Sequence, residues 1–328
     1  MQKLTINIDA SAIKESSCGL RLFYNIVEGY KEKLPNNDIV FGKAFHNFRE
    51  KWRITKNQFA ATALALQYYK TAPMNMKSNK QYLTSSFITD ITDQYDGQHQ
   101  DDTLETVYTN PELTILHYNG GDRIPLIESN ARFAFPLVAE DDIDILCCGT
   151  MDEIAQDRVS KKYHIVDCKT TSSWNWREYF DGYKLDPQLM MYRWALKQYA
   201  AAHPETIWAQ LEKENPSCMI EGAFYKGGSA GGRPSVEFKR SEPFNFTTYQ
   251  LEEFQTLLLK IVWDLVGNIR EWKRTGNLPL RQGISNGSCL TKFGPCKYFG
   301  ACSKIDAESR ESELEFHFVK KPYDPLSF

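Results

Sequence analysis

Two neighbouring stretches indicate how this chain folds: Cys148-Gly-Thr-Met-Asp152-Glu-Ile and His164-Ile-Val-Asp167-Cys-Lys169-Thr-Thr. Side chains alternate along an extended strand, so Asp167 and Lys169 are expected on the same face of the second stretch. The apolar pair that precedes Asp167 predicts a strand in the interior of a sheet. A carboxylate and an ammonium in such a strand must pair or bind a ligand, because isolated buried charge is costly.

Asp152 lies on the neighbouring expected strand, from which its carboxylate can approach the same point. Two carboxylates and the main-chain carbonyl of Cys168 suit a hard cation such as Mg²⁺, which prefers oxygen ligands and keeps several waters. Lys169 beside such a site can orient or deprotonate an attacking water and stabilise developing charge. A buried Asp–Lys ion pair that only joins two strands is the alternative, and these residues alone leave it open.

The rest of the chain alternates helical and extended patterns, which predicts a mixed α/β fold. Helical spacing of apolar residues occurs within a region from about 11 to 82, and helices are also expected at about 186–201 and 247–275. The Gly-rich segment 226–234 lacks the Gly-Lys-Ser/Thr of a phosphate-binding loop, so it is interpreted as a hairpin connection. The expected strands cover residues 131–137, 143–154, 162–170, 219–225 and 236–239.

The net charge of −3 over 328 residues does not decide between partners. The segment 81–122 contains no Lys or Arg and eight acidic residues, so it accounts for more than the whole net charge. A solvated acidic surface is the simplest interpretation of that segment. A nucleic-acid partner therefore remains compatible with the composition.

No run approaches the roughly 18 apolar residues of a membrane helix, and the start MQKLTINIDA is not typical of a signal peptide. We therefore expect an intracellular protein that does not associate with membranes. Thiols stay reduced in that compartment, where cysteines serve metals or catalysis more often than disulfides.

Two helical patterns carry further polar candidates. His46 follows Gly42 in Gly-Lys-Ala-Phe-His, and Gln188 and Tyr192 lie one turn apart on one face of the helix expected at about 186–201. Taken singly, a helical histidine or a Gln–Tyr pair has an ordinary structural role more often than a functional one.

Together these motifs resemble the PD-(D/E)XK nuclease superfamily, and specifically its RecB-like branch of exonucleases and CRISPR-adaptation or phage nucleases. That branch has a helical Gly-x-x-x-His, a Gly-x-x-Asp, an Asp/Glu-x-Lys at the end of an apolar strand, and a Gln-x-x-x-Tyr helix, in this order. The chain has Gly42 to His46, Gly149 to Asp152, Asp167-Cys-Lys169, and Gln188 to Tyr192.

The resemblance implies a restriction-endonuclease-like fold, in which a mixed β-sheet core is flanked by helices. It implies that His46, Asp152, Asp167 and the main-chain carbonyl of Cys168 bind Mg²⁺ or Mn²⁺. It also implies that Lys169 is the catalytic lysine. Gln188 and Tyr192 would then support the site or contact DNA.

Four of the eight cysteines are candidates for a second metal centre. Cys289, Cys296 and Cys302 lie in one short segment, and Cys18 lies near the other end of the chain. The resemblance extends to RecB-like nucleases that hold a 4Fe–4S cluster with one N-terminal and three C-terminal cysteines, which would clamp the two ends together. A zinc site, or no metal, remains an alternative. The other four, in apolar strand contexts, are interpreted as small buried residues: Cys147, Cys148, Cys168 and Cys218.

Locally basic segments are candidates for contacts with the DNA backbone. They are Arg49 and Lys51 beside His46, and Lys226 and Arg233 at the Gly-rich segment. Simple solvation is the alternative for each of these side chains.

On this resemblance we expect one nuclease domain over residues 1–328. It comprises an N-terminal helical part (11–82), a catalytic α/β core (128–240), a long helix with the cysteine segment (247–302) and a tail (303–328). The expected activity is that of a metal-dependent DNA nuclease, an exonuclease acting on ends or single strands in recombination, repair or phage DNA processing. The partner classes implied are recombination, helicase and CRISPR-adaptation proteins, and the implied origins include a phage. The alternatives are a catalytically silent DNA-binding subunit with a structural cluster, and an iron–sulfur redox or radical enzyme.

Overall fold

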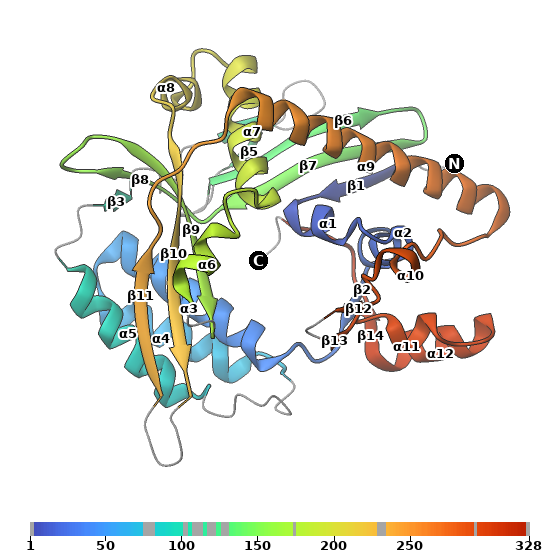
Figure 1. Ribbon diagram of the computed structural model, residues 1–328, viewed down its shortest axis with the longest axis horizontal. Helices are drawn as coiled ribbons and strands as arrows, with labels where there is room; N and C mark the ends of the chain where they lie inside the picture. Colours follow the sequence, from blue (N-terminus) through green and yellow to red (C-terminus); the bar gives the residue numbers. More distant parts are fainter. Residues whose placement is uncertain are drawn as a thin grey trace.

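A computed structural model describes residues 3–74, 83–100, 104–106, 114–116, 123–125, 131–172, 175–227, 234–291 and 294–325 (Figure 1). The fold is a mixed α/β architecture, as the sequence predicts. The helices are α1 (Ala10–Glu15), α2 (Gly19–Leu22), α3 (Asn37–Thr55), α4 (Gln58–Thr71), α5 (Ser85–His99), α6 (Trp176–Asp181), α7 (Pro187–Ala202), α8 (Ile207–Lys213), α9 (Thr248–Thr275), α10 (Gly283–Asn286), α11 (Phe299–Cys302) and α12 (Ala307–His317). The strands are β1 (Leu4–Ile8), β2 (Tyr30–Glu32), β3 (Leu104–Thr106), β4 (Thr114–Leu116), β5 (Arg123–Pro125), β6 (Ala131–Ala139), β7 (Ile143–Met151), β8 (Glu153–Asp157), β9 (Tyr163–Thr171), β10 (Ser217–Lys226), β11 (Ser235–Arg240), β12 (Leu290–Thr291), β13 (Gly294–Pro295) and β14 (Phe318–Lys320).

The largest sheet has the strand order β11-β10-β9-β8-β3. Its centre is a parallel pair, β9 and β10, which are joined through α6, α7 and α8. Strands β8 and β11 run antiparallel to their central neighbours. The expected strand over 162–170 is therefore confirmed as an interior strand, and the Gly-rich segment does connect two antiparallel strands.

The strand expected over 143–154 is instead two strands in two sheets. Strand β7 ends at Met151 and pairs with β1 and β6, whereas β8 begins at Glu153 and pairs with β9. The chain changes its hydrogen-bonding partners at this point, so Asp152 belongs to neither strand. The apolar pattern runs through the break because both sheets bury this segment.

Helices α3, α4 and α5 pack beside the five-stranded sheet and build one of the cores (Figure 1). The buried residues of α3 recur at the spacing of one helical face, so a continuous apolar stripe lies against the sheet. They include Phe41, Phe45, Phe48 and Trp52. Asn36 caps the start of α3, where its side chain accepts a hydrogen bond from the Asp38 amide. This packing fixes α3 directly beside β9.

A second core lies between the β1-β7-β6 sheet and helices α7 and α9 (Figure 1). A capping box at Thr247 and Gln250 starts α9, and Gly276 ends it with a φ of 75°. The helix expected over 247–275 is thus confirmed. None of the helices in the described ranges combines the length and apolar composition that crossing a membrane requires.

The C-terminal residues form more structure than the expected charged tail. They contain α12 and strand β14, and β14 pairs with β2 from the N-terminal region. The Tyr298 hydroxyl donates a 2.8 Å hydrogen bond to the Tyr30 carbonyl, which ties the same regions together. Phe318 is buried at this junction, so apolar burial accompanies the strand pairing.

Candidate active site

Four segments of the chain meet where β9 ends. Strand β9 carries Asp167 and Lys169, the break between β7 and β8 carries Asp152, and α3 carries His46. The first turns of α7 carry Gln188 and Tyr192. The structure therefore brings together the residues that the sequence motifs single out.

Asp167 and Lys169 form the centre of one hydrogen-bonded chain. The Lys169 Nζ lies 2.6 Å from Asp167 Oδ2 and donates to Gln188 Oε1 at 3.1 Å. The Gln188 amide nitrogen donates to Asp167 Oδ1 at 2.9 Å and to the Tyr192 hydroxyl at 2.7 Å. Tyr192 in turn donates to the Thr150 carbonyl at 2.7 Å. One end of α7 thus holds both the carboxylate and the ammonium in place.

Asp152 and His46 flank this chain on the side of α3. The Cys168 amide donates to Asp152 Oδ2 at 2.8 Å, so the backbone of β9 fixes the Asp152 carboxylate. His46 Nδ1 lies 3.4 Å from the same oxygen. A hydrogen bond also links the His46 ring to the backbone of Cys168. The main chain at Cys168 therefore lies between Asp152 and His46.

Burial and the neighbouring charges shift the pKa values of these groups. Burial raises the pKa of Asp167 to about 6, with Lys169 opposing the shift and Asp152 adding to it. Burial acts to lower the pKa of Lys169, but the Asp167 and Asp152 carboxylates outweigh it, so the pKa is raised. Desolvation lowers the pKa of His46. Lys169 is accordingly an ammonium at neutral pH and serves as a hydrogen-bond donor.

Two glycines allow these elements to approach closely. A Cβ on Gly42 would lie 2.9 Å from the Thr170 hydroxyl oxygen, so α3 contacts β9 there without room for a side chain. A Cβ on Gly149 would lie 2.7 Å from the ring of Phe133. Close packing therefore explains why the Gly-x-x-x-His and Gly-x-x-Asp motifs of this chain have glycine at these two positions.

Arg49 is not placed to contact DNA, which corrects the expectation from the sequence. Its side chain is only 3% exposed, and its guanidinium lies 2.5 Å from both Glu153 and Glu221. Both carboxylates belong to the sheet beneath His46: Glu153 follows Asp152, and Glu221 is the register partner of Cys168. Further contacts to Glu221 come from Arg53 at 3.4 Å, Tyr95 at 3.2 Å, His99 at 3.1 Å and Arg240 at 2.9 Å.

We refer to Arg49, Arg53, Glu153, Glu221 and Arg240 as the arginine–glutamate cluster. Burial alone would raise the pKa of Glu221, but Arg49, Arg53 and Arg240 hold it well below its usual range. This cluster is not predictable from the sequence, because its members lie on α3 and on the three strands β8, β10 and β11. The one local signal was a basic residue on the same face of α3 as its buried aromatic residues.

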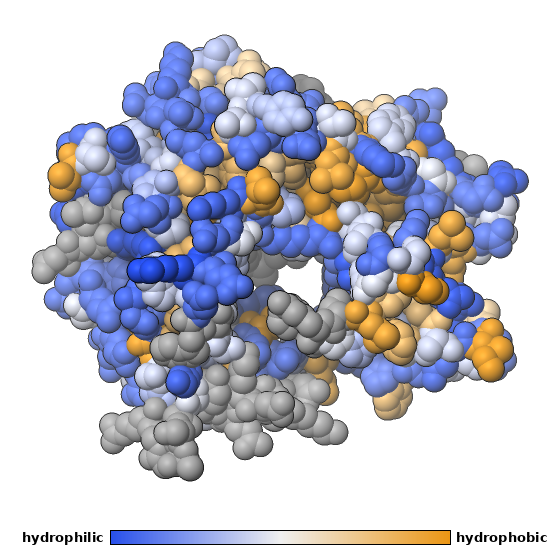
Figure 2. Space-filling model, in the orientation of Figure 1, coloured by the Kyte–Doolittle hydropathy of each residue, from blue (hydrophilic) through white to orange (hydrophobic). Residues whose placement is uncertain are grey.

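Of the other three basic candidates, two are exposed and one is not among the residues that the structure describes. Lys51 is exposed on α3, and Lys226 is exposed at the end of β10. Arg233 lies outside the described residues. In the orientation of Figure 1, Figure 2 shows an opening through the molecule between α3 and α6 on one side and β12, β13 and β14 on the other.

The donor set at the site has the chemistry of a hard-cation site. Two carboxylates, a backbone carbonyl and an imidazole suit a divalent cation such as Mg²⁺ or Mn²⁺. Within the described ranges, no three His, Cys, Asp or Glu side chains converge as a ready-made metal site. Here the Asp167 carboxylate is held by Lys169 and Gln188, and Asp152 by the Cys168 amide.

The structure brings Cys18 to the C-terminal cysteines. Cys18, Cys289, Cys296 and Cys302 line one small cavity of about 20 Å³, together with Arg21 and Arg281. Burial and the neighbouring cysteines raise the pKa of Cys289, while the two arginines act to lower it. The remaining cysteines are fully buried, as expected for packing residues: Cys147, Cys148, Cys168 and Cys218.

The mixed sheet, the Asp-x-Lys at the end of its central strand and the supporting Gln–Tyr helix define a protein of the restriction-endonuclease-like class. The family model of the PD-(D/E)XK nuclease superfamily matches residues 14–303. The chain therefore belongs to this superfamily, and its general activity is that of a nuclease, a phosphodiesterase. No curated protein matches the chain.

Proposed function

We propose that the protein is a metal-dependent DNA exonuclease that acts on ends or single strands. The observation that carries this proposal is the convergence of Asp152, Asp167 and Lys169 at one point, where α7 and α3 add Gln188 and His46. A site for DNA binding alone would not need these mutually dependent buried charges.

His46, Asp152, Asp167 and the Cys168 carbonyl would hold Mg²⁺ or Mn²⁺. When bound, such an ion lowers the pKa of water and offsets phosphate charge. Lys169 donates hydrogen bonds, so it orients the attacking water and stabilises the negative charge that develops on the phosphate. Gln188 positions the Asp167 carboxylate and the Lys169 ammonium by a hydrogen bond to each. Tyr192 accepts a hydrogen bond from Gln188 and donates one to the backbone of β7.

We further propose that Cys18, Cys289, Cys296 and Cys302 hold a 4Fe–4S cluster that joins the two ends of the chain. Support comes from the shared cavity that the four side chains line. A zinc ion would require sulfurs about 3.8 Å apart, since each Zn–S bond is about 2.3 Å long. A cluster spreads its thiolates over four irons, so it accepts thiolates that lie farther apart than the ligands of a single ion.

The proposed biological setting is intracellular recombination, repair or phage DNA processing, in which DNA ends are the substrate. Helicase, recombination and CRISPR-adaptation proteins are the partner classes that would supply such ends. A phage-encoded origin is part of this proposal.

The proposed activity predicts cleavage of linear but not covalently closed DNA. With Mg²⁺ or Mn²⁺ the protein should release nucleotides or short oligonucleotides from labelled linear single- or double-stranded DNA, and EDTA should abolish the release. A closed circular single strand of the same sequence should remain intact, because it offers no end. Rapid cutting of the circle would contradict the exonuclease assignment, and no cutting of any DNA would favour a silent DNA-binding subunit.

The proposed cluster predicts a brown protein when it is purified without oxygen. Iron analysis should give about four irons per chain, with broad visible absorption near 400 nm. Replacing Cys302 with Ser should remove most of the iron, because one ligand is lost. Replacing the buried Cys218 with Ala should leave the iron content unchanged. Equal iron in both variants, or zinc in the anaerobic wild-type protein, would overturn the cluster.

A further inference from the structure

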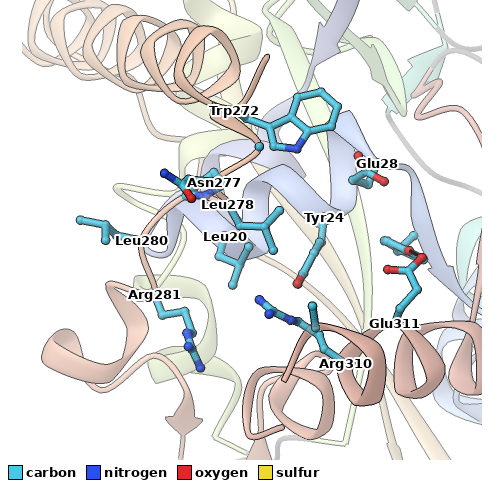
Figure 3. A pocket seen from close by; sticks show the side chains of 14 residues that line it. Leu20, Tyr24, Glu28, Trp272, Asn277, Leu278, Leu280, Arg281, Arg310 and Glu311 are labelled. Carbon is cyan, nitrogen blue, oxygen red and sulfur yellow. Dashed lines mark hydrogen bonds between the residues drawn. The ribbon is translucent and has the colours of Figure 1, made fainter. Parts of the chain in front are cut away.

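A second cavity of about 730 Å³ lies away from the catalytic residues (Figure 3). Its walls come from the π-helical segment Phe23–Val27, the end of α9 with the loop that follows, and α12. In Figure 1, the end of α9 and α12 lie on the opposite side of the molecule from β9 and α3. The volume is within the range of about 300–1,000 Å³ that is typical of small-molecule sites.

A guanidinium and a hydroxyl lie side by side in this cavity, where a hydrogen bond joins the Arg310 side chain to the Tyr24 hydroxyl oxygen. Tyr24 is only 2% exposed, yet its hydroxyl finds no acceptor among the residues that the structure describes. Figure 3 shows the Arg310 guanidinium beside this hydroxyl. In the same described ranges, no carboxylate pairs with Arg310. A buried hydroxyl without an acceptor costs free energy, which a ligand with acceptor atoms would recover.

The acidic residues of the cavity are already paired. Glu28 Oε2 lies 2.8 Å from the Lys320 Nζ, and Glu311 Oε1 accepts a 2.9 Å hydrogen bond from the Tyr30 hydroxyl. Burial raises the pKa of Tyr24, and Arg310 acts against this shift, so the hydroxyl keeps its proton. The groups that remain to be satisfied are therefore a cation and a neutral donor, which together favour an oxyanion.

The remaining walls favour an oxyanion attached to a flat or apolar body. Leu20 and Leu278 line the cavity beside Tyr24, and Trp272 lines it above Tyr24 (Figure 3). A guanidinium presents a planar fork of donors that matches phosphate, and an indole offers a face for a nucleobase. The nearby carboxylates of Glu28 and Glu311 can accept from the amino or hydroxyl groups of such a body.

We propose that this cavity binds the phosphate group of a nucleotide, with Arg310 and Tyr24 as its donors. The substrates and products of a nuclease carry this group, so a free deoxynucleoside monophosphate and the phosphorylated end of a DNA strand share the required chemistry. Binding here needs no turnover at Lys169. The inference therefore stands or falls independently of the proposed exonuclease activity.

Isothermal titration calorimetry without divalent metal tests the proposal. The probes are deoxyadenosine 5′-monophosphate, and one oligonucleotide prepared with and without a 5′-phosphate. We expect the wild-type protein to bind the monophosphate or to prefer the phosphorylated oligonucleotide. Arg310→Gln should weaken that binding by about tenfold or more, because a charged hydrogen bond is lost, and Tyr24→Phe by about fivefold.

Matched variants keep the outcome interpretable. Arg274→Gln removes an exposed arginine of α9 that pairs with Glu271 outside the cavity, and it should bind both probes as the wild-type protein does. If Arg310→Gln fails to fold, Arg310→Lys keeps the charge, loses the fork and should still weaken binding. An effect of Arg310 on the monophosphate alone identifies a free nucleotide, and an effect on the phosphorylated oligonucleotide alone identifies a DNA end. Binding of neither probe, or binding unaffected by Arg310, would overturn the proposal.

Discussion

Replacing Lys169 with Ala should reduce DNA cleavage by about a hundredfold to ten-thousandfold, the range expected for a positioned catalytic group. The Lys169 ammonium contacts Asp167 and Gln188, and it is the donor proposed to face the phosphate. Without it, the developing phosphate charge loses its donor. Initial rates of release from end-labelled linear DNA, measured at saturating Mg²⁺ or Mn²⁺, provide the test.

The matched control is Lys162→Ala, which removes an exposed lysine just before the same strand. That variant should cleave DNA at the wild-type rate. Binding of Mn²⁺ by the Lys169 variant should persist, since the proposed ligands remain, and this can be followed by electron paramagnetic resonance. Cleavage by the Lys169 variant within tenfold of the wild-type rate would show that Lys169 is a structural ion-pair partner only.

Replacing Arg49 with Met should destabilise the protein by about 3–5 kcal/mol, the cost typical of removing one partner from a buried ion pair. Glu153 and Glu221 are each only 2% exposed at the side chain, and both lose a guanidinium at 2.5 Å. Methionine retains much of the packing volume, so the effect reports mainly on charge. Urea denaturation followed by circular dichroism measures the free energy of unfolding.

Lys51→Met is the control for this prediction, because Lys51 lies two residues away on the same helix and is exposed. It should change the free energy of unfolding by no more than about 0.5 kcal/mol. A similar small effect for Arg49→Met would mean that the remaining arginines of the arginine–glutamate cluster neutralise both carboxylates. The same pair of variants separates the two interpretations of the basic segment beside His46, since only Lys51 is placed at the surface.

Short-range patterns in the sequence predicted most of the secondary structure. The apolar run before Asp167 identified β9, and the strands expected over 131–137, 219–225 and 236–239 coincide with β6, β10 and β11. Caps at Thr247 and Gly276 lie where the helical pattern of α9 begins and ends. These features depend on neighbouring residues, so the sequence reports them directly.

Strand β1 and the break at Asp152 were not predicted. Strand β1 pairs with β7, which lies about 140 residues later in the chain. The break at Asp152 arises because β7 and β8, which share one continuous apolar pattern, pair in different sheets. Neither the pairing of β1 nor the break at Asp152 has a signal in the neighbouring residues, because both depend on hydrogen-bond partners that are distant in sequence.

For the site, the sequence by itself determined which residue types stand in motif order: His46, Asp152, Asp167, Lys169 and Gln188. Only the tertiary structure decided their contacts and the fate of the basic residues beside them. Arg49 and Lys51 have similar charge and are two positions apart, yet one is buried against two glutamates and the other is exposed. Helical periodicity places Arg49 on the apolar face of α3 and Lys51 off it. The glutamates that pair with the buried Arg49 come from β8 and β10, so only long-range contacts decide that pairing.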